Sequence, residues 1–361
     1  VGAAATPERF ADAVSSAARA LDTDALIAVF VPPVATPGAA YAHALRAEVA
    51  DLDKPVLSTF LAVEGVPAEL AVPGPDGQPG PGSVPSYPSP ERAVAALARV
   101  LRYARWRDAP VGEYVRPEGI RPGHARELVR EHYSGAAGAP VPLDDAATTE
   151  LLACYRIEVT PFRLVDSVEA ATSAADELGY PVAVKGVGER WEGPELIGTR
   201  LDLGSAGAVA AAYHDLARVT GRRELYVQRM APKGPSCTLE VVDDPSFGSL
   251  VSFGLSGIAT ELLGDRAHRV IPLSTSDAHE LIRAPRAAPL LAGYGGAEPA
   301  DLASLEDLAL RVSCLAEDLP EVRSLRLRPI LAAPTTASVT AARVVLGPPP
   351  TRHDGGPRRL R

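Results

Sequence analysis

The chain has 361 residues, which is long enough for two or three domains that each bury a core of their own. Its 36 basic and 45 acidic residues give a formal net charge of −9, so the composition excludes the broad basic surface of a protein that binds nucleic acid or an anionic membrane. The apolar run at residues 25–31 ends at two prolines, far short of the roughly 20 residues that a membrane span needs.

The cysteines and the first residue bear on compartment and completeness. Cys154, Cys237 and Cys314 are odd in number and far apart, and no histidine stands beside them, which argues against a disulfide framework and against a zinc site. We therefore expect a cytoplasmic protein. The chain begins at Val1 without a basic and apolar export signal, so we expect it to be a fragment or to start within a domain.

Helices and apolar strands alternate at the start of the chain. The pattern predicts a helix at 6–21 with Thr6 as its N-cap, a strand at 25–31, a helix at 41–52 and a strand at 55–61. Continuous apolar strands between helices are typical of a parallel sheet covered on both faces. Two strands are few for such a sheet, so either more strands lie upstream or a partner completes it.

A segment rich in proline and glycine follows at residues 72–90. By composition it could be a linker. However, the helix predicted at 91–106 can pack back on the sheet through four apolar side chains, namely Val94, Leu97, Leu101 and Tyr103. We therefore predict that the segment is a structured crossing within the first domain.

The expected domain boundary is the sequence SGAAGA at residues 134–139, which follows a short helix predicted within 116–133. We predict a first domain over residues 1–135, a second over 140–350 and a loosely held tail over 351–361.

The second domain has a lysine in an unusual position. After predicted helices at 143–155 and 167–178, a buried strand at 180–188 reads YPVAVKGVG and carries Lys185 just before two glycines. A strand-end ammonium beside glycines is suited to bind a phosphate. The other interpretation is a lysine that is only solvated.

The stretch 225–273 combines strands, glycines and charges. Apolar runs at 225–227, 239–242 and 250–253 are typical of successive antiparallel strands joined by tight turns. Gly254 and Gly257 allow a ligand to approach the backbone closely. The charged residues Glu261, Asp265, Arg266 and Arg269 follow directly. This layout predicts a ligand that bears phosphate.

Several of these motifs resemble one family. PVAVKGVG, LYVQRMAPKG and DPSFGSLVSFGLSGIATELLGDRAHRVIPL are similar to the ATP-grasp region of NDP-forming acyl-CoA synthetases, in the bacterial form fused to an acetyltransferase, with a match over residues 144–348. Residues 1–133, with KPVLSTF and SYPSPERA, resemble the end of the preceding ligase domain. The resemblance implies an α/β protein, in which a partial flavodoxin-like parallel-sheet domain is followed by an ATP-grasp domain of two α+β subdomains.

The resemblance also implies roles for individual residues and implies ATP or ADP as the cofactor. Lys185 would reach the phosphates of the nucleotide. The backbone of a hinge would pair with adenine, and a second group would shape the phosphate side of the cleft. The hinge residues are Val227, Gln228, Arg229 and Met230, and the second group is Gly254, Gly257, Glu261 and Arg269. The family makes acyl-CoA, ADP and phosphate from an acid, CoA and ATP through a shuttling phosphohistidine.

Parts of that machinery differ here. The shuttle histidine of the family belongs to a domain upstream of Val1, and the usual histidine in the loop after Lys185 is absent from residues 192–198. Where the family writes Leu-Asp-Leu-Asn-Pro, with the asparagine on Mg²⁺, this chain has arginines at Arg326 and Arg328. A second metal-binding aspartate aligns with Ala341, and Ser236 stands where the family usually has glutamate.

The two arginines change the expected chemistry. Arginine has no lone pair to donate to a metal, but its guanidinium can bind phosphate oxygens directly. We therefore expect nucleotide contact through Arg328 and doubt dependence on Mg²⁺. The other interpretation is that Arg326 and Arg328 only point to solvent at a strand end.

Three hypotheses follow for function. The first is a diverged ATP-grasp module with a regulatory or pseudoenzyme role, which binds nucleotide but lacks what is needed to make acyl-CoA alone. The second is an active ATP-binding half that works with a separate CoA-binding or acetyltransferase chain, with metal ligands recruited from Glu240, Asp243 or Asp244. The third is a fragment without activity.

Overall fold

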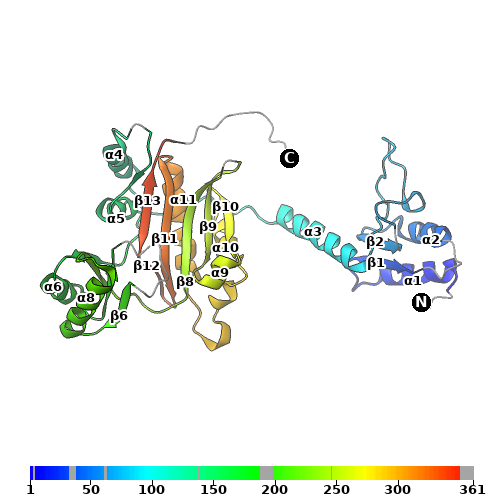
Figure 1. Ribbon diagram of the computed structural model, residues 1–361. Coiled ribbons are helices and arrows are strands. Elements are labelled where there is room, and N and C mark those ends of the chain that lie inside the picture. The colour runs from blue at the N-terminus through cyan, green and yellow to red at the C-terminus, as the bar shows by residue number, and fades with distance from the viewer. Residues whose placement is uncertain are drawn as a thin grey trace. The chain divides into compact units, whose positions relative to one another are not determined.

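The computed structural model describes residues 1–2, 5–31, 38–60, 63–136, 138–187, 198–244 and 246–349. The chain divides into two compact units, Val1–Pro110 and Val111–Arg361 (Figure 1). Among the described residues, no helix is long and apolar enough to cross a membrane. The predicted tail at 351–361 and the loop 192–197 lie outside the described residues.

The first unit has a short parallel sheet. Its elements are α1 (Pro7–Arg19), β1 (Leu26–Phe30), α2 (Ala39–Val49) and β2 (Val56–Phe60). The two strands pair in parallel, as predicted. Thr6 caps α1 by accepting a hydrogen bond from the backbone N–H of Arg9. Edge-to-face and tilted contacts among Phe10, Phe30 and Tyr41 fill the core between α1, α2 and the sheet.

The segment 72–90 is structured, as predicted. After η1 (Ala68–Leu70), three backbone hydrogen bonds fix its path. The N–H of Gly74 donates to Gln78 O, that of Gly80 donates to Val72 O, and that of Val84 donates to Leu70 O. A Cβ on Gly74 would lie 2.7 Å from Gln78 O, so only glycine allows this crossing.

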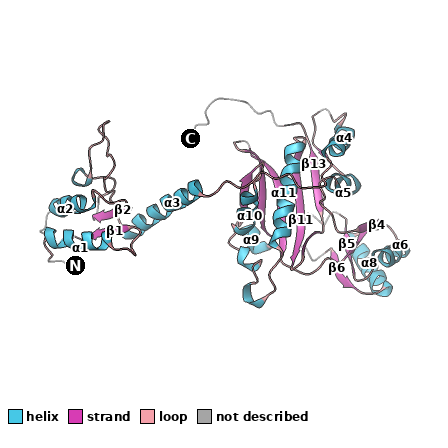
Figure 2. Ribbon diagram, turned by 180° about the vertical axis from the view of Figure 1, so that it is seen from behind, coloured by secondary structure: helices cyan, strands magenta, loops and turns pink. Residues whose placement is uncertain are grey.

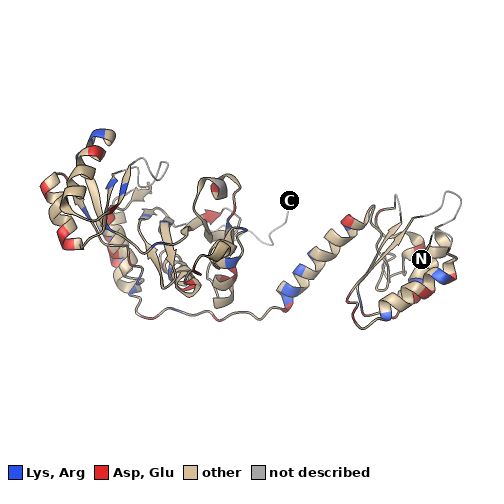
Figure 3. Cartoon of the chain, turned by 90° about the horizontal axis from the view of Figure 1, so that it is seen from below, with Lys and Arg blue, Asp and Glu red and all other residues tan. Residues whose placement is uncertain are grey.

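Helix α3 (Pro90–Asp108) begins at its N-cap Ser89, with Glu91 in the first turn and two arginines in the last, which complements the helix dipole (Figure 3). The prediction that its apolar face packs on the sheet is wrong for Val94 and Tyr103, which are more than half exposed, and for Leu101. Leu97 is half-buried. For Leu101 and Tyr103 the reason is size, because 19 residues span roughly 28 Å, whereas two strands are only about 10 Å wide. Val94 lies near the start of the helix, next to the fully buried Ala93, and points to a different side.

The second unit begins before the expected boundary. Helix α4 (Pro122–Tyr133) packs on α5 (Asp145–Ala153), and its buried Leu128 and Val129 belong to the same core as Leu151 and Leu152. Residues 111–135 were expected in the first domain, yet their packing is with the elements that follow the SGAAGA sequence.

An antiparallel sheet of seven strands forms the largest part of this unit. Its order is β10-β9-β8-β11-β13-β3, and β12 pairs with β11. Helices α10 (Thr275–Arg283) and α11 (Leu302–Asp318) cover one face (Figure 2). The strands are β3 (Val141–Pro142), β8 (Ser236–Asp244), β9 (Gly248–Leu255), β10 (Ala267–Val270), β11 (Val322–Ala333), β12 (Thr336–Val339) and β13 (Ala342–Leu346). Short helices α9 (Ile258–Leu262), η2 (Ala288–Leu290) and η3 (Tyr294–Gly296) connect them.

A second sheet has four antiparallel strands in the order β4-β7-β5-β6. They are β4 (Phe162–Val165), β5 (Val182–Gly186), β6 (Thr199–Leu203) and β7 (Leu225–Arg229). Helices α6 (Val168–Leu178) and α8 (Ala206–Thr220) lie on one face and enclose a separate core (Figure 1). Ser167 and Ser205 cap these helices, and Gly179 ends α6 with a positive φ, which agrees with the helix predicted at 167–178.

One prediction about the stretch 225–273 is wrong. Its first strand, β7, does not pair with β8 but lies in the middle of the four-stranded sheet. The intervening Pro232 and Pro235 have no N–H, so they cannot continue an antiparallel ladder from β7 into β8. Strands β8, β9 and β10 do pair successively, as predicted.

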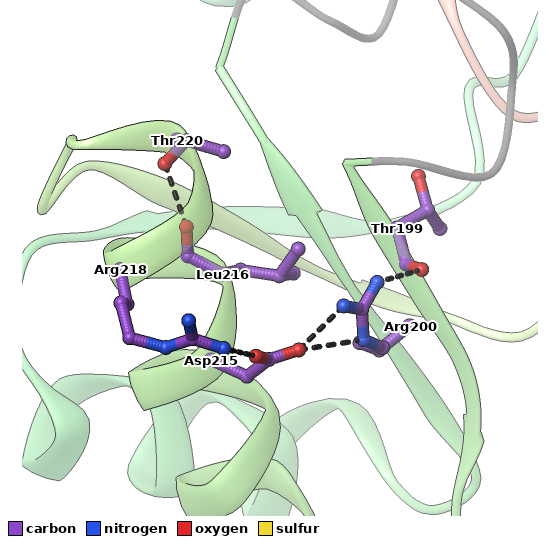
Figure 4. Close-up of polar contacts among 6 residues, drawn as sticks. All are labelled: Thr199, Arg200, Asp215, Leu216, Arg218 and Thr220. Atoms are coloured by element: carbon purple, nitrogen blue, oxygen red, sulfur yellow. Dashed lines mark hydrogen bonds and ion pairs between the residues drawn. The ribbon is translucent and has the colours of Figure 1, made fainter.

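Asp215 joins helix α8 to the edge strand β6 (Figure 4). Its carboxylate accepts hydrogen bonds from Nε of Arg200 at 3.0 Å and from Nη2 of Arg218 at 2.7 Å. The bonds from Arg200, and then those from Arg218, lower the pKa of Asp215. A lowered folded-state pKa means that the interaction stabilises above the unfolded pKa of about 4 and is lost as pH falls through the folded value.

We therefore predict that acid loosens β6 and α8 in the wild type more than in Asp215→Asn, which lacks the titrating group. Hydrogen exchange of the amides of β6 and α8, compared at pH 6 and near pH 3, measures this. Arg218→Ala is expected to change protection less than Arg200→Ala, since the Arg218 side chain is 76% exposed. Equal acid sensitivity in the wild type and Asp215→Asn would contradict the prediction.

Candidate functional site

Lys185 and Gln228 lie together on the face of the four-stranded sheet opposite its core. The ammonium of Lys185 donates to Oε1 of Gln228 at 2.7 Å. Gln228 is 2% exposed, and its Nε2 donates to the carbonyl oxygens of Thr160 and Thr340 at 2.8 and 2.9 Å. Thr340 precedes β13, so this amide joins the two sheets of the unit.

The predicted hinge residues are engaged within the protein. Val227 and Gln228 lie in the middle of β7, which is paired with β4 on one side and β5 on the other. The N–H of Arg229 donates to Pro161 O, and that of Met230 donates to Pro181 O, both at 3.1 Å. Any nucleotide contact at these two residues would therefore use other atoms than their amide hydrogens.

A cavity of about 820 Å³ lies beside the hinge. Arg229 and Met230 line it, together with segments 157–161, 231–233 and 336–338. The volume is in the range of sites that hold small ligands. The other predicted site residues do not line this cavity.

A row of polar side chains crosses the seven-stranded sheet on the face opposite helices α10 and α11. We call it the polar row. Directly opposed residues on neighbouring strands place their side chains on the same face. The register aligns, in order across the sheet, Arg343, Arg326, Glu240, Ser252 and His268.

Glu240 is the centre of the polar row. It is 7% exposed, and its Oε2 accepts a hydrogen bond from Nη1 of Arg266 at 2.7 Å. Its Oε1 lies 2.7 Å from Nε of Arg326, an ion pair without hydrogen-bond geometry. The hydroxyl of Ser252, opposite Glu240, is buried and has no hydrogen-bond partner. A buried carboxylate is stable here because two guanidinium groups offset its charge.

Arg328 and the predicted residues near it are also on this side. Arg328 forms an ion pair with Glu261, so these two predicted site residues are brought together. A Cβ on Gly254 would lie 2.8 Å from the carbonyl oxygen of Asp265, so the chain itself occupies the space that was expected for a ligand. Gly257 has a φ of 143°, a backbone conformation that favours glycine.

Arg269 is not brought to this site. It opposes Val251, a core residue of β9, whereas its neighbour His268 opposes Ser252 in the polar row. Its guanidinium instead binds Glu280 of α10 at 2.8 Å. The alternation of side chains along β10 separates Arg269 from the polar row.

The residues considered as recruited metal ligands do not converge. Glu240 pairs with two arginines, Asp243 pairs with Arg323, and Asp244 accepts backbone N–H groups in the turn that follows β8. Across the described ranges, no group of three or more His, Cys, Asp or Glu side chains could hold a metal ion. Burial raises the pKa of Cys237 to about 12, which keeps this thiol protonated. The three candidate ligands are therefore each engaged by other groups of the protein and do not meet at one point.

Sequence reasoning missed the pairing of Glu240 with Arg266 and Arg326. A signal for it was present, because polar residues alternate with apolar ones in TLEV and LRLRP, as expected of strands with one polar face. The partners come from strands that are far apart in the sequence, so the pairing itself could not be derived from spacing.

Gln228 allows a direct test of the contact between the sheets. We predict that Gln228→Ala lowers the free energy of unfolding by about 2–4 kcal/mol, because it leaves two buried carbonyls and the Lys185 ammonium without this partner and opens a cavity. Urea denaturation measures the loss. Arg229→Ala, at an exposed neighbouring position, is the control and should change stability by at most about 0.5 kcal/mol. A similar small change in Gln228→Ala would contradict the role assigned to its amide.

Comparison with known proteins gives consistent matches. Residues 138–346 match the family described as ATP-grasp domain. The chain is 30% identical over 285 residues to acetate–CoA ligase (ADP-forming) I of Archaeoglobus fulgidus, which covers 73% of this chain and 39% of that protein. It is 30% identical over 239 residues to the beta subunit of acetate–CoA ligase (ADP-forming) I of Pyrococcus furiosus, which covers 63% of this chain and 99% of that subunit. The chain thus spans about two fifths of the first relative and nearly all of the second.

Solved structures agree with these relatives. Acetyl-coenzyme A synthetase 1 of Candidatus Korarchaeum cryptofilum, in complex with coenzyme A and Ca-AMPCP, is 29% identical with a TM-score of 0.54, over 62% of this chain and 99% of that one. A second structure of the same enzyme, with coenzyme A and Mg-AMPPCP, is 30% identical with a TM-score of 0.52 over the same shares.

Proposed function

Since this chain belongs to the NDP-forming acyl-CoA synthetase family and carries its ATP-grasp domain, we propose that it binds ATP or ADP without a metal ion and serves a regulatory role. The family and the α/β fold predicted from the motifs are confirmed. The proposal does not include formation of acyl-CoA by this chain alone. It does include a cytoplasmic location.

The observation that supports this proposal is the position of Arg326 and Arg328 on β11 and their ion pairs with carboxylates. On β11, Arg328 stands where the family resemblance implies a metal-binding asparagine, and Arg326 stands where it implies an aspartate; each is paired with a carboxylate, Arg326 with Glu240 and Arg328 with Glu261. Phosphoryl transfer in nucleotide-dependent enzymes depends on metal ions that neutralise charge on the phosphates. Guanidinium groups can hold phosphate oxygens without a metal, but they cannot take over coordination of an ion.

Two elements would hold the nucleotide. Lys185, on β5, would bind a phosphate in exchange for its contact with Gln228. Arg328 would bind another phosphate once Glu261 moves away, which is feasible because the Glu261 side chain is 41% exposed. Lys185 lies near the end of β5, whereas Arg328 lies within β11, so both cations are held on regular strands.

A second candidate function is the active ATP-binding half of an acyl-CoA synthetase. The observation that favours it is the match to a relative that is a separate beta subunit, almost all of which this chain spans. In that case a CoA-binding chain, or an acetyltransferase chain, would be the partner and would supply the groups that this chain lacks.

Calorimetric titration distinguishes the two functions. We expect ADP and ATP to bind with the same dissociation constant in Mg²⁺ and in EDTA, because the contacts proposed are direct. Lys185→Ala and Arg328→Ala should each weaken binding roughly 10-fold or more, the value of one charge-assisted contact.

The control is Arg283→Ala, which removes an exposed arginine of α10 that pairs with Glu306. Its affinity for ADP should equal that of the wild type. Binding that requires Mg²⁺ would contradict the metal-free proposal and favour the active half, and the absence of any nucleotide binding would contradict both.

A further inference from the structure

One buried carboxylate holds two cations in the polar row. The side chain of Glu240 is 9% exposed, whereas those of Arg266 and Arg326 are 28% and 43% exposed. The two arginines come from different parts of the chain: Arg266 immediately precedes β10, and Arg326 lies on β11. Glu240 therefore lies deeper than both guanidinium groups and binds one with each oxygen.

Most donors of these arginines are not used by Glu240. Arg266 engages it through Nη1 alone and Arg326 through Nε alone. Among the described residues, neither guanidinium group makes another hydrogen bond or ion pair. A guanidinium carries five N–H donors in a planar fork that matches the oxygens of phosphate. The outer edges of both groups can therefore accept an anion from solvent.

The charge balance of this face also favours an anion. Two guanidinium groups, those of Arg266 and Arg326, share the single carboxylate of Glu240. The chain as a whole carries a net charge of −9. A local excess of positive charge in an acidic protein draws anions to that point.

Ser252 is an independent observation that points to a ligand. It is 1% exposed, lies directly opposite Glu240, and its hydroxyl has no hydrogen-bond partner. Buried hydroxyl groups are nearly always paired in native proteins. This unpaired hydroxyl stands opposite the residue whose carboxylate binds both guanidinium groups.

We infer that Glu240, Arg266, Arg326 and Ser252 form a metal-independent binding site for a diphosphate anion, in which Glu240 is the internal counter-ion of the arginines. The chemistry that they recognise is a diphosphate, either free or as part of a nucleotide. Where the diphosphate belongs to a nucleotide, the inference rests on the proposed function. The bound anion adds negative charge next to two cations that Glu240 alone only partly neutralises.

Titration of inorganic diphosphate and of ADP, both in EDTA, tests this site. Arg266→Ala and Arg326→Ala should each raise the dissociation constant for diphosphate at least about 10-fold, since each removes a charge-assisted fork. Glu240→Gln should lower that constant roughly 3- to 10-fold, because it removes a negative charge within a few ångströms of the anion. Arg283→Ala, on α10, should leave it unchanged.

The outcomes separate this site from the proposed function. Diphosphate that fails to bind the wild type, or that binds all variants equally, overturns the site, even where ADP still binds through Lys185. Weaker binding in Glu240→Gln overturns the counter-ion role. Diphosphate binding that depends on both arginines supports the site, even where ADP fails to bind and the proposed function falls. If Arg266→Ala does not fold by circular dichroism, Arg266→Gln removes the same charge while keeping more of the packing.

Discussion

The two-residue period of the strands is the constraint on which the seven-stranded sheet and its polar row depend. Along β8, Leu239 and Val241 face the core under α10 and α11, and Glu240 between them faces the other side. The same holds on β11 for Leu325 and Arg326. A slip of one residue in the pairing would move charges into the core, so burial of the apolar face fixes the register of the charges.

That register determines the electrostatics of the site. Glu240 is buried by its neighbours, and a buried carboxylate without a partner is costly, so the two arginines are part of the fold as well as of the surface. Breaking a buried ion pair from one side typically costs about 3–5 kcal/mol. The arginine at position 326 is compatible with the sheet because the carboxylate of Glu240 stands opposite.

Local features of the fold could be read from the sequence, and pairings between distant segments could not. Helix caps and helix ends depend on residues within a few positions, as at Thr6, Ser89 and Gly179. The parallel pair β1–β2 follows from the alternation of helices and apolar strands. The position of β7 in the other sheet depends on prolines whose effect is only clear once both ladders are known.

The same distinction holds for the candidate site. The motifs led to Lys185, Gln228 and Arg328 because these lie in contiguous family-like segments. Spacing did not indicate that Arg269 faces α10, or that Arg326 is paired rather than solvated. These contacts depend on the order of the strands in the sheet. The family resemblance predicts the fold, but it does not predict the partner of a residue that differs from the family.

A continuous chain of contacts connects the two sheets and gives a physical basis for a regulatory role. The Lys185 ammonium binds Gln228, whose amide binds the carbonyl of Thr340. The next residue, Ala341, accepts the backbone N–H of Arg328 at 3.0 Å. In the proposed function, one phosphate draws Lys185 away from Gln228, which is the first contact of this chain, and another draws the guanidinium of Arg328 from Glu261, beside the last contact. A nucleotide bound in this way would act at both ends of the contacts that join the two sheets, and a partner chain that contacts both sheets would respond to such a change.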